Sequence, residues 1–207
     1  MGKTKIKICG LKRPEDIQSV NSLKPDYVGF VFAKSNRQVT EKVETSLREL
    51  LLAEISTVGV FVREPIERIT RLCKEKIIQI IQLHGEEDAE YIKRLRHEVP
   101  DIPIIRAVRV RSGEQILEAE KMDCEYLLLD TYIKGTYGGS GKQFDKRLIP
   151  RLEKPYFLAG GLDAGNVREN IEACHPYAVD VSSTVETDGI KDAIKIQNFI
   201  ERVRNHE

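Results

Sequence analysis

The 207-residue chain lacks an excess of charge of either sign, because it holds 33 Lys and Arg residues and 33 Asp and Glu residues. Proteins that bind nucleic acid or an acidic membrane surface usually carry a basic excess or a basic patch. The sequence also has no aromatic-rich basic motif and no run of about 18 apolar residues, which base stacking and a transmembrane helix would require. We therefore expect a small-molecule partner, no nucleic acid and no membrane.

Cysteine is scarce, and its spacing excludes two further classes of protein. The four cysteines, Cys9, Cys73, Cys124 and Cys174, lie far apart and form no CxxC pair. Structural zinc sites use closely spaced cysteines, and small secreted domains use many of them in a disulfide framework. The N-terminal segment also lacks the long apolar stretch of a signal peptide. The sequence thus predicts a cytoplasmic protein.

The glycine-rich segment at 135–141 lacks the patterns of nucleotide-binding loops. A P-loop needs glycine where this chain has Thr136, and Ser or Thr where Gln143 follows Lys142. The dinucleotide fingerprint fails because Phe144 occupies the place of its third glycine. The segment is predicted to be a mobile cover over a site or a plain flexible turn, and its glycines are Gly135, Gly138, Gly139 and Gly141.

Short β-rich segments alternate with longer amphipathic segments along the whole chain, in about eight repeats. The predicted strands span 5–9, 27–32, 57–61, 77–83, 102–108, 126–130, 156–159 and 178–181. Helices are predicted to begin at Pro14 and to span 40–53, 66–74, 114–121 and 191–204, of which 114–121 has the weakest pattern. We expect a single domain over 1–207, a compact (βα)8 TIM barrel with a weak or short fifth helix. An open flavodoxin-like sheet is the alternative, because the chain is short for a barrel.

Asp130 closes an apolar run, YLLLD, at the start of the glycine-rich segment. The run shows no polar alternation, which is typical of a parallel strand covered on both faces. Ligands bind at the carboxyl ends of such strands, so Asp130 is a candidate for chemistry. The alternative is an aspartate that only stabilises a turn or caps a helix.

Two later strands end in segments suited to phosphate. One runs into Gly160 and Gly161 in FLAGGLDAGNV, and the next runs into Ser182 and Ser183 in AVDVSST. In barrels the loops after the seventh and eighth strands bind phosphate through backbone N–H groups and hydroxyls. The alternative is ordinary turns and helix caps, with Asn166 and Ser182 as capping residues.

Taken together, these motifs resemble the phosphoribosylanthranilate isomerases of tryptophan biosynthesis. The resemblance spans nearly the whole chain and rests on KICGL, GFVFAKSNR, QLHGEE, LLLD with GGSGKQFD, LAGGL, and DVSS with VE. It implies a small (βα)8 barrel that converts N-(5′-phosphoribosyl)anthranilate to 1-(o-carboxyphenylamino)-1-deoxyribulose 5-phosphate by an Amadori rearrangement. It also implies that neither a cofactor nor a metal is needed. Oligomeric state, monomer or homodimer, stays open.

The resemblance also implies a role for individual residues. Asp130 would be the general acid, Cys9 the general base, and Arg37 the ligand of the anthranilate carboxylate. The implied phosphate site consists of Gly160, Gly161, Ser182, Ser183 and Thr184. Without the resemblance, Cys9 is typical of a buried strand cysteine and Arg37 of a solvated loop.

An acid must be protonated and a base unprotonated at the same pH, so the surroundings of Asp130 and Cys9 should move both pKa values from their usual ~3.9 and ~8.5. Cations or helix N-termini near the barrel mouth would favour the Cys9 thiolate. His84 has no metal-binding motif around it and is expected to be structural.

Two residues depart from the family pattern, which usually has glycine at Thr184 and tryptophan at Lys146. A β-branched residue resists positive φ, so the loop at Thr184 is expected to differ in shape or to use the hydroxyl as an added donor. Rival functions are another phosphosugar barrel, such as an indoleglycerol phosphate synthase or an epimerase, and a barrel that binds a phosphorylated ligand without turnover.

Overall fold

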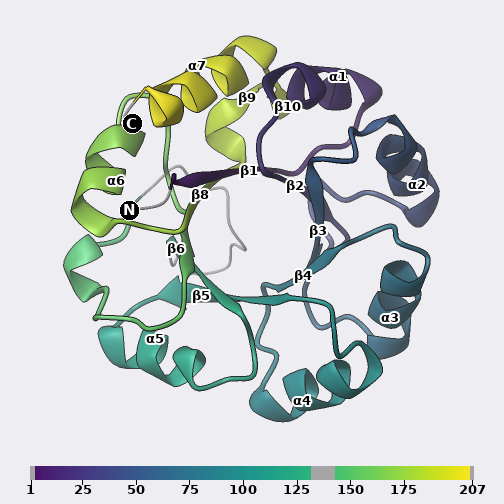
Figure 1. The fold of residues 1–207 in the computed structure, drawn as a ribbon, viewed down its shortest axis with the longest axis vertical. Coiled ribbons are helices and arrows are strands. Elements are labelled where there is room, and N and C mark those ends of the chain that lie inside the picture. The colour runs from purple at the N-terminus through teal and green to yellow at the C-terminus, as the bar shows by residue number, and fades with distance from the viewer. Residues whose placement is uncertain (1–2, 132–142, 206–207) are drawn as a thin grey trace.

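The computed structural model describes residues 3–131 and 143–205. Eight parallel strands pair in chain order, and β8 pairs back with β1, so that the sheet closes into a barrel (Figure 1). The strands are β1 Lys5–Cys9, β2 Tyr27–Val31, β3 Ser56–Phe61, β4 Ile80–Leu83, β5 Ile104–Val110, β6 Tyr126–Thr131, β7 Tyr156–Leu158 and β8 Ala178–Val181. The predicted TIM barrel is confirmed, and the open flavodoxin-like sheet is wrong.

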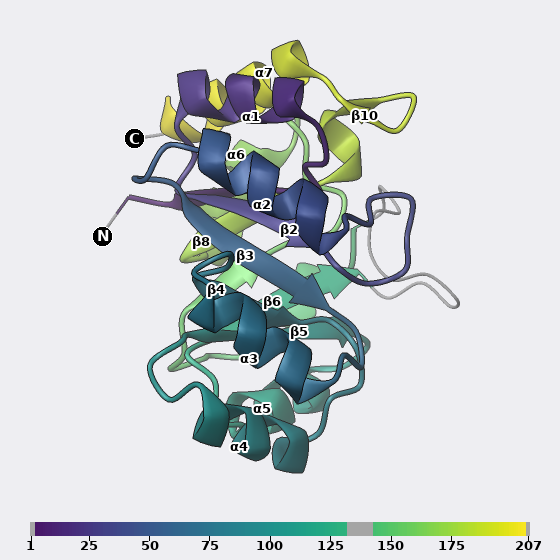
Figure 2. The ribbon, with the colours of Figure 1, turned by 90° about the vertical axis from the view of Figure 1, so that its right-hand side faces the viewer.

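Seven α-helices of the described ranges surround the barrel (Figures 1 and 2). They are α1 Pro14–Leu23, α2 Glu41–Leu50, α3 Ile66–Lys74, α4 Ala89–Glu98, α5 Gly113–Glu120, α6 Val167–Cys174 and α7 Ala193–Arg204. The fifth helix is short, as predicted, with 8 residues. Between β6 and β7 the described part of the connection holds only the 3-10 helix η1, Lys146–Leu148. The glycine-rich segment for which a mobile cover was predicted lies outside the described residues.

Short polar side chains fix where several helices begin. Asp88, Ser112 and Asp192 each accept a hydrogen bond from a backbone N–H of the first turn of α4, α5 and α7, respectively. These N–H groups have no partner inside the helix, so the side chain removes the cost of leaving them unpaired. In α1 the proline stands at the first helical position, where it loses no hydrogen bond.

Two predicted strands begin later than the sequence pattern suggested. The segment 77–83 contains β4 only from Ile80, because the N–H groups of Ile77 and Ile78 donate to the Leu72 carbonyl at the end of α3. The segment 102–108 forms β5 only from Ile104, and the N–H of Ile102 donates to the Val99 carbonyl instead. Apolar periodicity alone does not distinguish these turns from strand.

The two ends of the barrel differ in character. Tyr27 and Tyr126 begin their strands, Tyr177 precedes β8, and their rings pack around Phe157 in β7. This aromatic layer lies near the amino ends of the strands. Within the ranges that the structure covers, no helix has the length and apolar character needed to cross a membrane.

Candidate active site

A cavity of about 630 Å³ opens at the carboxyl ends of the strands. It lies among the ends of β1, β2, β3, β4, β6, β7 and β8 and the loops that follow several of them. The structure brings together in this one cavity every residue for which the sequence suggested a role, namely Cys9, Arg37, Asp130, Gly160, Gly161, Ser182, Ser183 and Thr184.

Cys9 is the last residue of β1 and is buried, with 7% of its surface exposed. On its side toward β2 it faces Gly29, where a Cβ atom would lie 2.6 Å from the Cys9 sulfur, so only glycine leaves room for the thiol. Cations do stand near it, as expected, since Lys7 and Lys191 both lower its pKa. Burial outweighs them, and the net effect raises the pKa of the Cys9 thiol above its ordinary value.

Asp130 near the end of β6 is oriented by its neighbours. Its Oδ1 accepts the N–H of Thr131 at 2.7 Å, and its Oδ2 lies 3.4 Å from Nε2 of His84. The other ring nitrogen of His84, Nδ1, lies 2.8 Å from Nε2 of Gln82. The two ring nitrogens of His84 thus face Gln82 on one side and the Asp130 carboxyl group on the other. Sequence reasoning left His84 out of the chemistry, although QLHGEE was the signal that could have included it.

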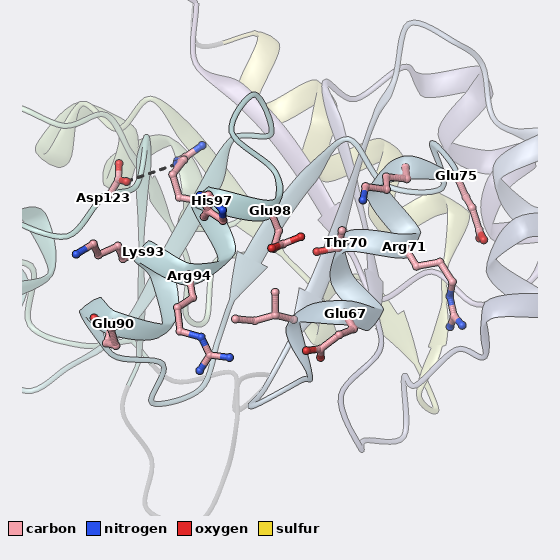
Figure 3. A pocket seen from close by; sticks show the side chains of 13 residues that line it. Glu67, Thr70, Arg71, Glu75, Glu90, Lys93, Arg94, His97, Glu98 and Asp123 are labelled. Atoms are coloured by element: carbon pink, nitrogen blue, oxygen red, sulfur yellow. Dashed lines mark ion pairs between the residues drawn. The ribbon is translucent and has the colours of Figure 1, made fainter.

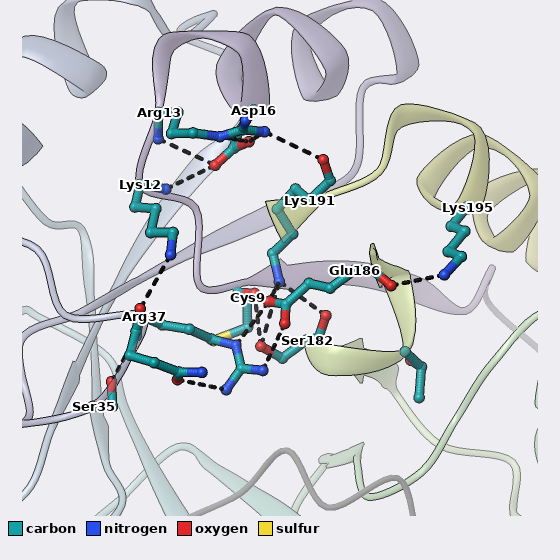
Figure 4. Close-up of polar contacts among 12 residues, drawn as sticks. Cys9, Lys12, Arg13, Asp16, Ser35, Arg37, Ser182, Glu186, Lys191 and Lys195 are labelled. Atoms are coloured by element: carbon teal, nitrogen blue, oxygen red, sulfur yellow. Dashed lines mark hydrogen bonds and ion pairs between the residues drawn. The ribbon is translucent and has the colours of Figure 1, made fainter. Parts of the chain in front are cut away.

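Arg37, in the loop between β2 and α2, is held by a bidentate ion pair (Figure 4). Its Nε and Nη2 donate to the two carboxylate oxygens of Glu186, each at 2.7 Å, and this contact raises the pKa of Arg37. Glu186 also accepts from Nζ of Lys191 at 2.6 Å, and Lys191 donates to the Ser182 carbonyl at 2.9 Å. The network therefore links Arg37 to the loop after β8.

No role was assigned to Glu186 or Lys191 from the sequence, although Glu186 belongs to the quoted VE. They belong to β9, Glu186–Thr187, and β10, Ile190–Lys191, a two-stranded hairpin that the helix prediction over 191–204 overlapped. The signal was present, since Asp188 and Gly189 have φ of 53° and 75° and Asp-Gly is the typical turn of a two-residue hairpin.

The loops after β7 and β8 present backbone in unusual conformations. Gly160 and Gly161 have φ of +83° and +67°, which only glycine adopts without strain. Asn166 does not cap α6, as the alternative interpretation had it; instead its Nδ2 donates to the Gly161 carbonyl at 2.9 Å. This contact fixes the orientation of the Gly161 peptide.

Thr184 lies in the 3-10 helix η2, Ser183–Val185, and is not among the residues with positive φ. A β-branched residue is therefore tolerated there. Its hydroxyl donates to the Leu162 carbonyl at 2.5 Å, so it joins the loops after β7 and β8. The second departure, Lys146, lies with its ammonium 3.9 Å from the centre of the Phe144 ring.

A larger cavity of about 910 Å³ lies elsewhere, between α3 and α4 (Figure 3). Its lining consists mostly of charged side chains of both signs, such as Glu67, Arg71, Lys93 and Glu98, and includes none of the predicted site residues. No group of three or more His, Cys, Asp or Glu side chains suited to a metal ion occurs within residues 3–131 and 143–205.

The barrel and its cavity define the class of this protein. A thiol, a carboxyl group, a guanidinium and two glycine- or serine-containing loops converge at the carboxyl ends of the strands, where (βα)8-barrel enzymes bind their substrates. The chain is thus an enzyme of the (βα)8-barrel class. A family model described as N-(5'phosphoribosyl)anthranilate (PRA) isomerase matches residues 6–202, and the chain belongs to this family.

Relatives of the same family match nearly the whole chain. The chain is 49% identical to the N-(5'-phosphoribosyl)anthranilate isomerase of Lachnoclostridium phytofermentans, over 95% of each chain, and 46% identical to that of Endomicrobium trichonymphae, over 97% and 98%. Among solved structures, phosphoribosyl anthranilate isomerase from Thermotoga maritima has a TM-score of 0.86 at 33% identity, with 98% and 99% of the chains covered. Another, at 31% identity with a TM-score of 0.81, was solved in complex with reduced 1-(o-carboxyphenylamino)-1-deoxyribulose 5-phosphate.

Proposed function

We propose that this chain converts N-(5′-phosphoribosyl)anthranilate to 1-(o-carboxyphenylamino)-1-deoxyribulose 5-phosphate, an Amadori rearrangement of tryptophan biosynthesis. The observation that carries the proposal is the placement of Cys9 and Asp130 on β1 and β6, both facing the cavity that Arg37 and the two loops also line. The site thus offers a base and an acid to one substrate, together with places for its two anionic ends.

The proposed chemistry consists of proton transfers within one molecule. Asp130 donates a proton to the furanose ring oxygen, the C1′–O bond breaks, and the anthranilate nitrogen forms an iminium with C1′. Cys9, as the thiolate, then removes the C2′ proton, and the electrons of that bond neutralise the iminium to give an enolamine. Tautomerisation yields the ketone. The His84 ring, whose Nε2 lies 3.4 Å from Oδ2 of Asp130, is placed to stabilise the carboxylate once Asp130 has given up its proton.

Substrate binding divides between the two sides of the cavity. We assign the phosphate to the peptides of Gly160 and Gly161 and to the 182–184 segment, where backbone N–H groups and hydroxyls converge. We assign the anthranilate carboxylate to Arg37, whose guanidinium charge attracts an anion. Glu186 occupies Nε and Nη2, so Nη1, which has only a 3.4 Å contact with Asn36, is the nitrogen open to substrate.

The remaining expectations belong to the same proposal. Two acid–base side chains suffice for the chemistry, so no cofactor is proposed. The four cysteines are free thiols, which fits a reducing cytoplasm. A related isomerase from Thermotoga maritima is described as dimeric, and we propose a monomer or a homodimer here.

Fluorescence tests the proposal directly, because the anthranilate conjugate is fluorescent and its signal decays as it reacts. We expect decay with the wild type, and a kcat lower by about 10²–10⁴ in Cys9→Ala and in Asp130→Asn, with unchanged circular dichroism. Cys73→Ala is the matched control, since Cys73 is equally buried but lies in α3. Near-normal turnover by either site variant would remove its assignment. No decay with the wild type would favour a barrel that only binds phosphorylated ligands.

A further inference from the structure

Lys7 is fully buried, with none of its surface exposed. A lysine is rarely buried completely, because removing an ammonium from water costs several kcal/mol unless a partner compensates it. Its partner is Asp180 in β8, whose Oδ1 lies 2.9 Å from Nζ. Asp180 itself lines the active-site cavity. The pair therefore places a positive charge directly beneath the site.

Strand geometry brings this charge to the proposed base. Lys7 and Cys9 are two residues apart on β1, so both point into the barrel. In the register of the sheet, Lys7 lies opposite Asp180 and Cys9 lies opposite Gly29. Since glycine has no side chain, β2 leaves room for the thiol at this position.

The charged groups around Cys9 come from four elements. Lys7 on β1 and Lys191 on β10 lower the pKa of the thiol, Asp180 on β8 raises it, and Arg37 in the loop after β2 also interacts with it. Of the cations, Lys7 has the larger effect on the thiol, and Lys191 is already paired with Glu186. Burial opposes the thiolate, so a base at this position depends on its nearest cation.

We propose that Lys7, which is paired with Asp180, is a positioning residue whose ammonium stabilises the Cys9 thiolate and so enables it to act as the base. This inference rests on the proposed function, in which Cys9 accepts the C2′ proton. Lys7 stays protonated throughout: the thiolate–ammonium pair becomes a thiol beside an ammonium, and the proton gained comes from the substrate. Asp180 competes with the thiolate for the same ammonium.

A purely structural role of the ion pair would have different consequences for the acidity of Cys9. If Lys7 only fills space, removing it changes stability but leaves the acidity of Cys9 alone. If Lys7 stabilises the thiolate, the two removals act in opposite directions. Losing the ammonium disfavours the thiolate, whereas losing Asp180 frees the ammonium for it.

The test measures the pH dependence of Cys9 alkylation by iodoacetamide in the substrate-free enzyme, with the Cys9 peptide quantified by mass spectrometry. We expect Lys7→Met to move the midpoint upward by about 1–3 pH units, and Asp180→Asn to move it downward. Each upward unit leaves about tenfold less thiolate at neutral pH, so kcat of Lys7→Met should fall about tenfold or more and recover as the pH rises. Lys5→Met is the matched control, because Lys5 lies on the same strand but pairs with Asp26 and is 43% exposed.

A folded Lys7→Met variant with the wild-type midpoint would overturn the proposal. If that variant does not fold, Asp180→Asn decides in its place, and an unchanged or raised midpoint there would overturn it equally. These alkylation measurements need no substrate. Normal turnover by Cys9→Ala would instead overturn the proposed function, whatever the alkylation midpoints show, so the two failures are distinguishable.

Discussion

At Gly160 two constraints meet in one residue. Its φ is +83°, and an added Cβ would lie 2.3 Å from the Thr131 hydroxyl oxygen and 3.0 Å from Oδ1 of Asp130. We expect Gly160→Ala to lower the free energy of unfolding by about 1–3 kcal/mol and to lower kcat, because the methyl group displaces the proposed acid. Urea denaturation and the fluorescence assay measure the two effects.

Gly189→Ala serves as the control for that variant. Gly189 has a similar φ of +75°, but a Cβ there would meet nothing within 4 Å. It should lose stability through backbone strain alone and keep kcat. Equal losses of kcat in both variants would contradict the role assigned to Gly160.

Some features of single residues could be predicted from the sequence and others could not. The ends of parallel strands were predictable, so Cys9 and Asp130 could be placed at one edge of the sheet. The ion pair of Arg37 with Glu186 could not, because the two residues are 149 positions apart and their contact depends on the closure of the barrel. The burial that raises the pKa of Cys9 is likewise a property of the folded site rather than of the motif.

At the scale of elements, the β9–β10 hairpin is the part that joins the two sides of the cavity. Figure 2 shows it at the same end of the barrel as the loop after β2, and Figure 4 shows the side chains that connect them. Its register places Glu186 opposite Lys191, which brings the carboxylate and the ammonium together. The hairpin thereby holds Arg37 and the Ser182 carbonyl in a fixed relation.

Glu186→Gln tests that coupling. The amide keeps the shape of the carboxylate but loses its charge, so it no longer forms two charge-assisted hydrogen bonds with Arg37. We expect KM for N-(5′-phosphoribosyl)anthranilate to rise about tenfold while kcat changes little, because the change affects binding in the ground state and the transition state alike. Steady-state kinetics separates the two constants.

Glu172→Gln is the matched control, since Glu172 forms an exposed ion pair with Arg168 on α6, away from the cavity. It should leave KM unchanged. A large fall in kcat for Glu186→Gln, with KM unaltered, would contradict the binding role and place Glu186 in the chemistry.

Helices and strands could be predicted from the sequence where the local apolar periodicity defines them. The β1 and β8 strands and the α3 helix span the predicted residues, because their apolar periodicity ends where capping or turn residues follow. The hairpin was missed because its strands are two residues each, too short for any periodicity. Only its Asp-Gly turn signalled it.

For the whole molecule, the fold followed from repetition rather than from any one segment. A strand-and-helix pattern repeated about eight times favours a closed barrel, and closure puts the carboxyl ends of β1, β6 and β8 around one cavity. The layer of helices outside the barrel contains a carboxyl group with no exposed surface, that of Glu44 in α2.

Glu44 makes the stability of the molecule depend on pH. Neither carboxylate oxygen has a hydrogen-bond partner in the described parts of the chain, and burial raises the pKa of Glu44 from its ordinary value of 4.5 to about 8, against the opposing charge of Arg48. Between these pH values the folded chain keeps the proton that the unfolded chain has lost, so a rising pH favours unfolding. The free energy of unfolding should therefore fall from about pH 4.5 to about pH 8 and lose no more through this group above that range.

Glu44→Gln removes the titrating proton and leaves the size of the side chain unchanged. We expect this variant to be more stable than the wild type at pH 8 by roughly 1–3 kcal/mol, since it no longer buries a group that prefers to ionise in water. Urea denaturation at several values between pH 5 and pH 9, spanning the pKa of about 8, measures the difference. Glu49→Gln, at an exposed position of the same helix, should show the same pH dependence of the free energy of unfolding as the wild type. If Glu44→Gln also kept the wild-type pH dependence of the free energy of unfolding, that dependence would arise from other groups in the barrel.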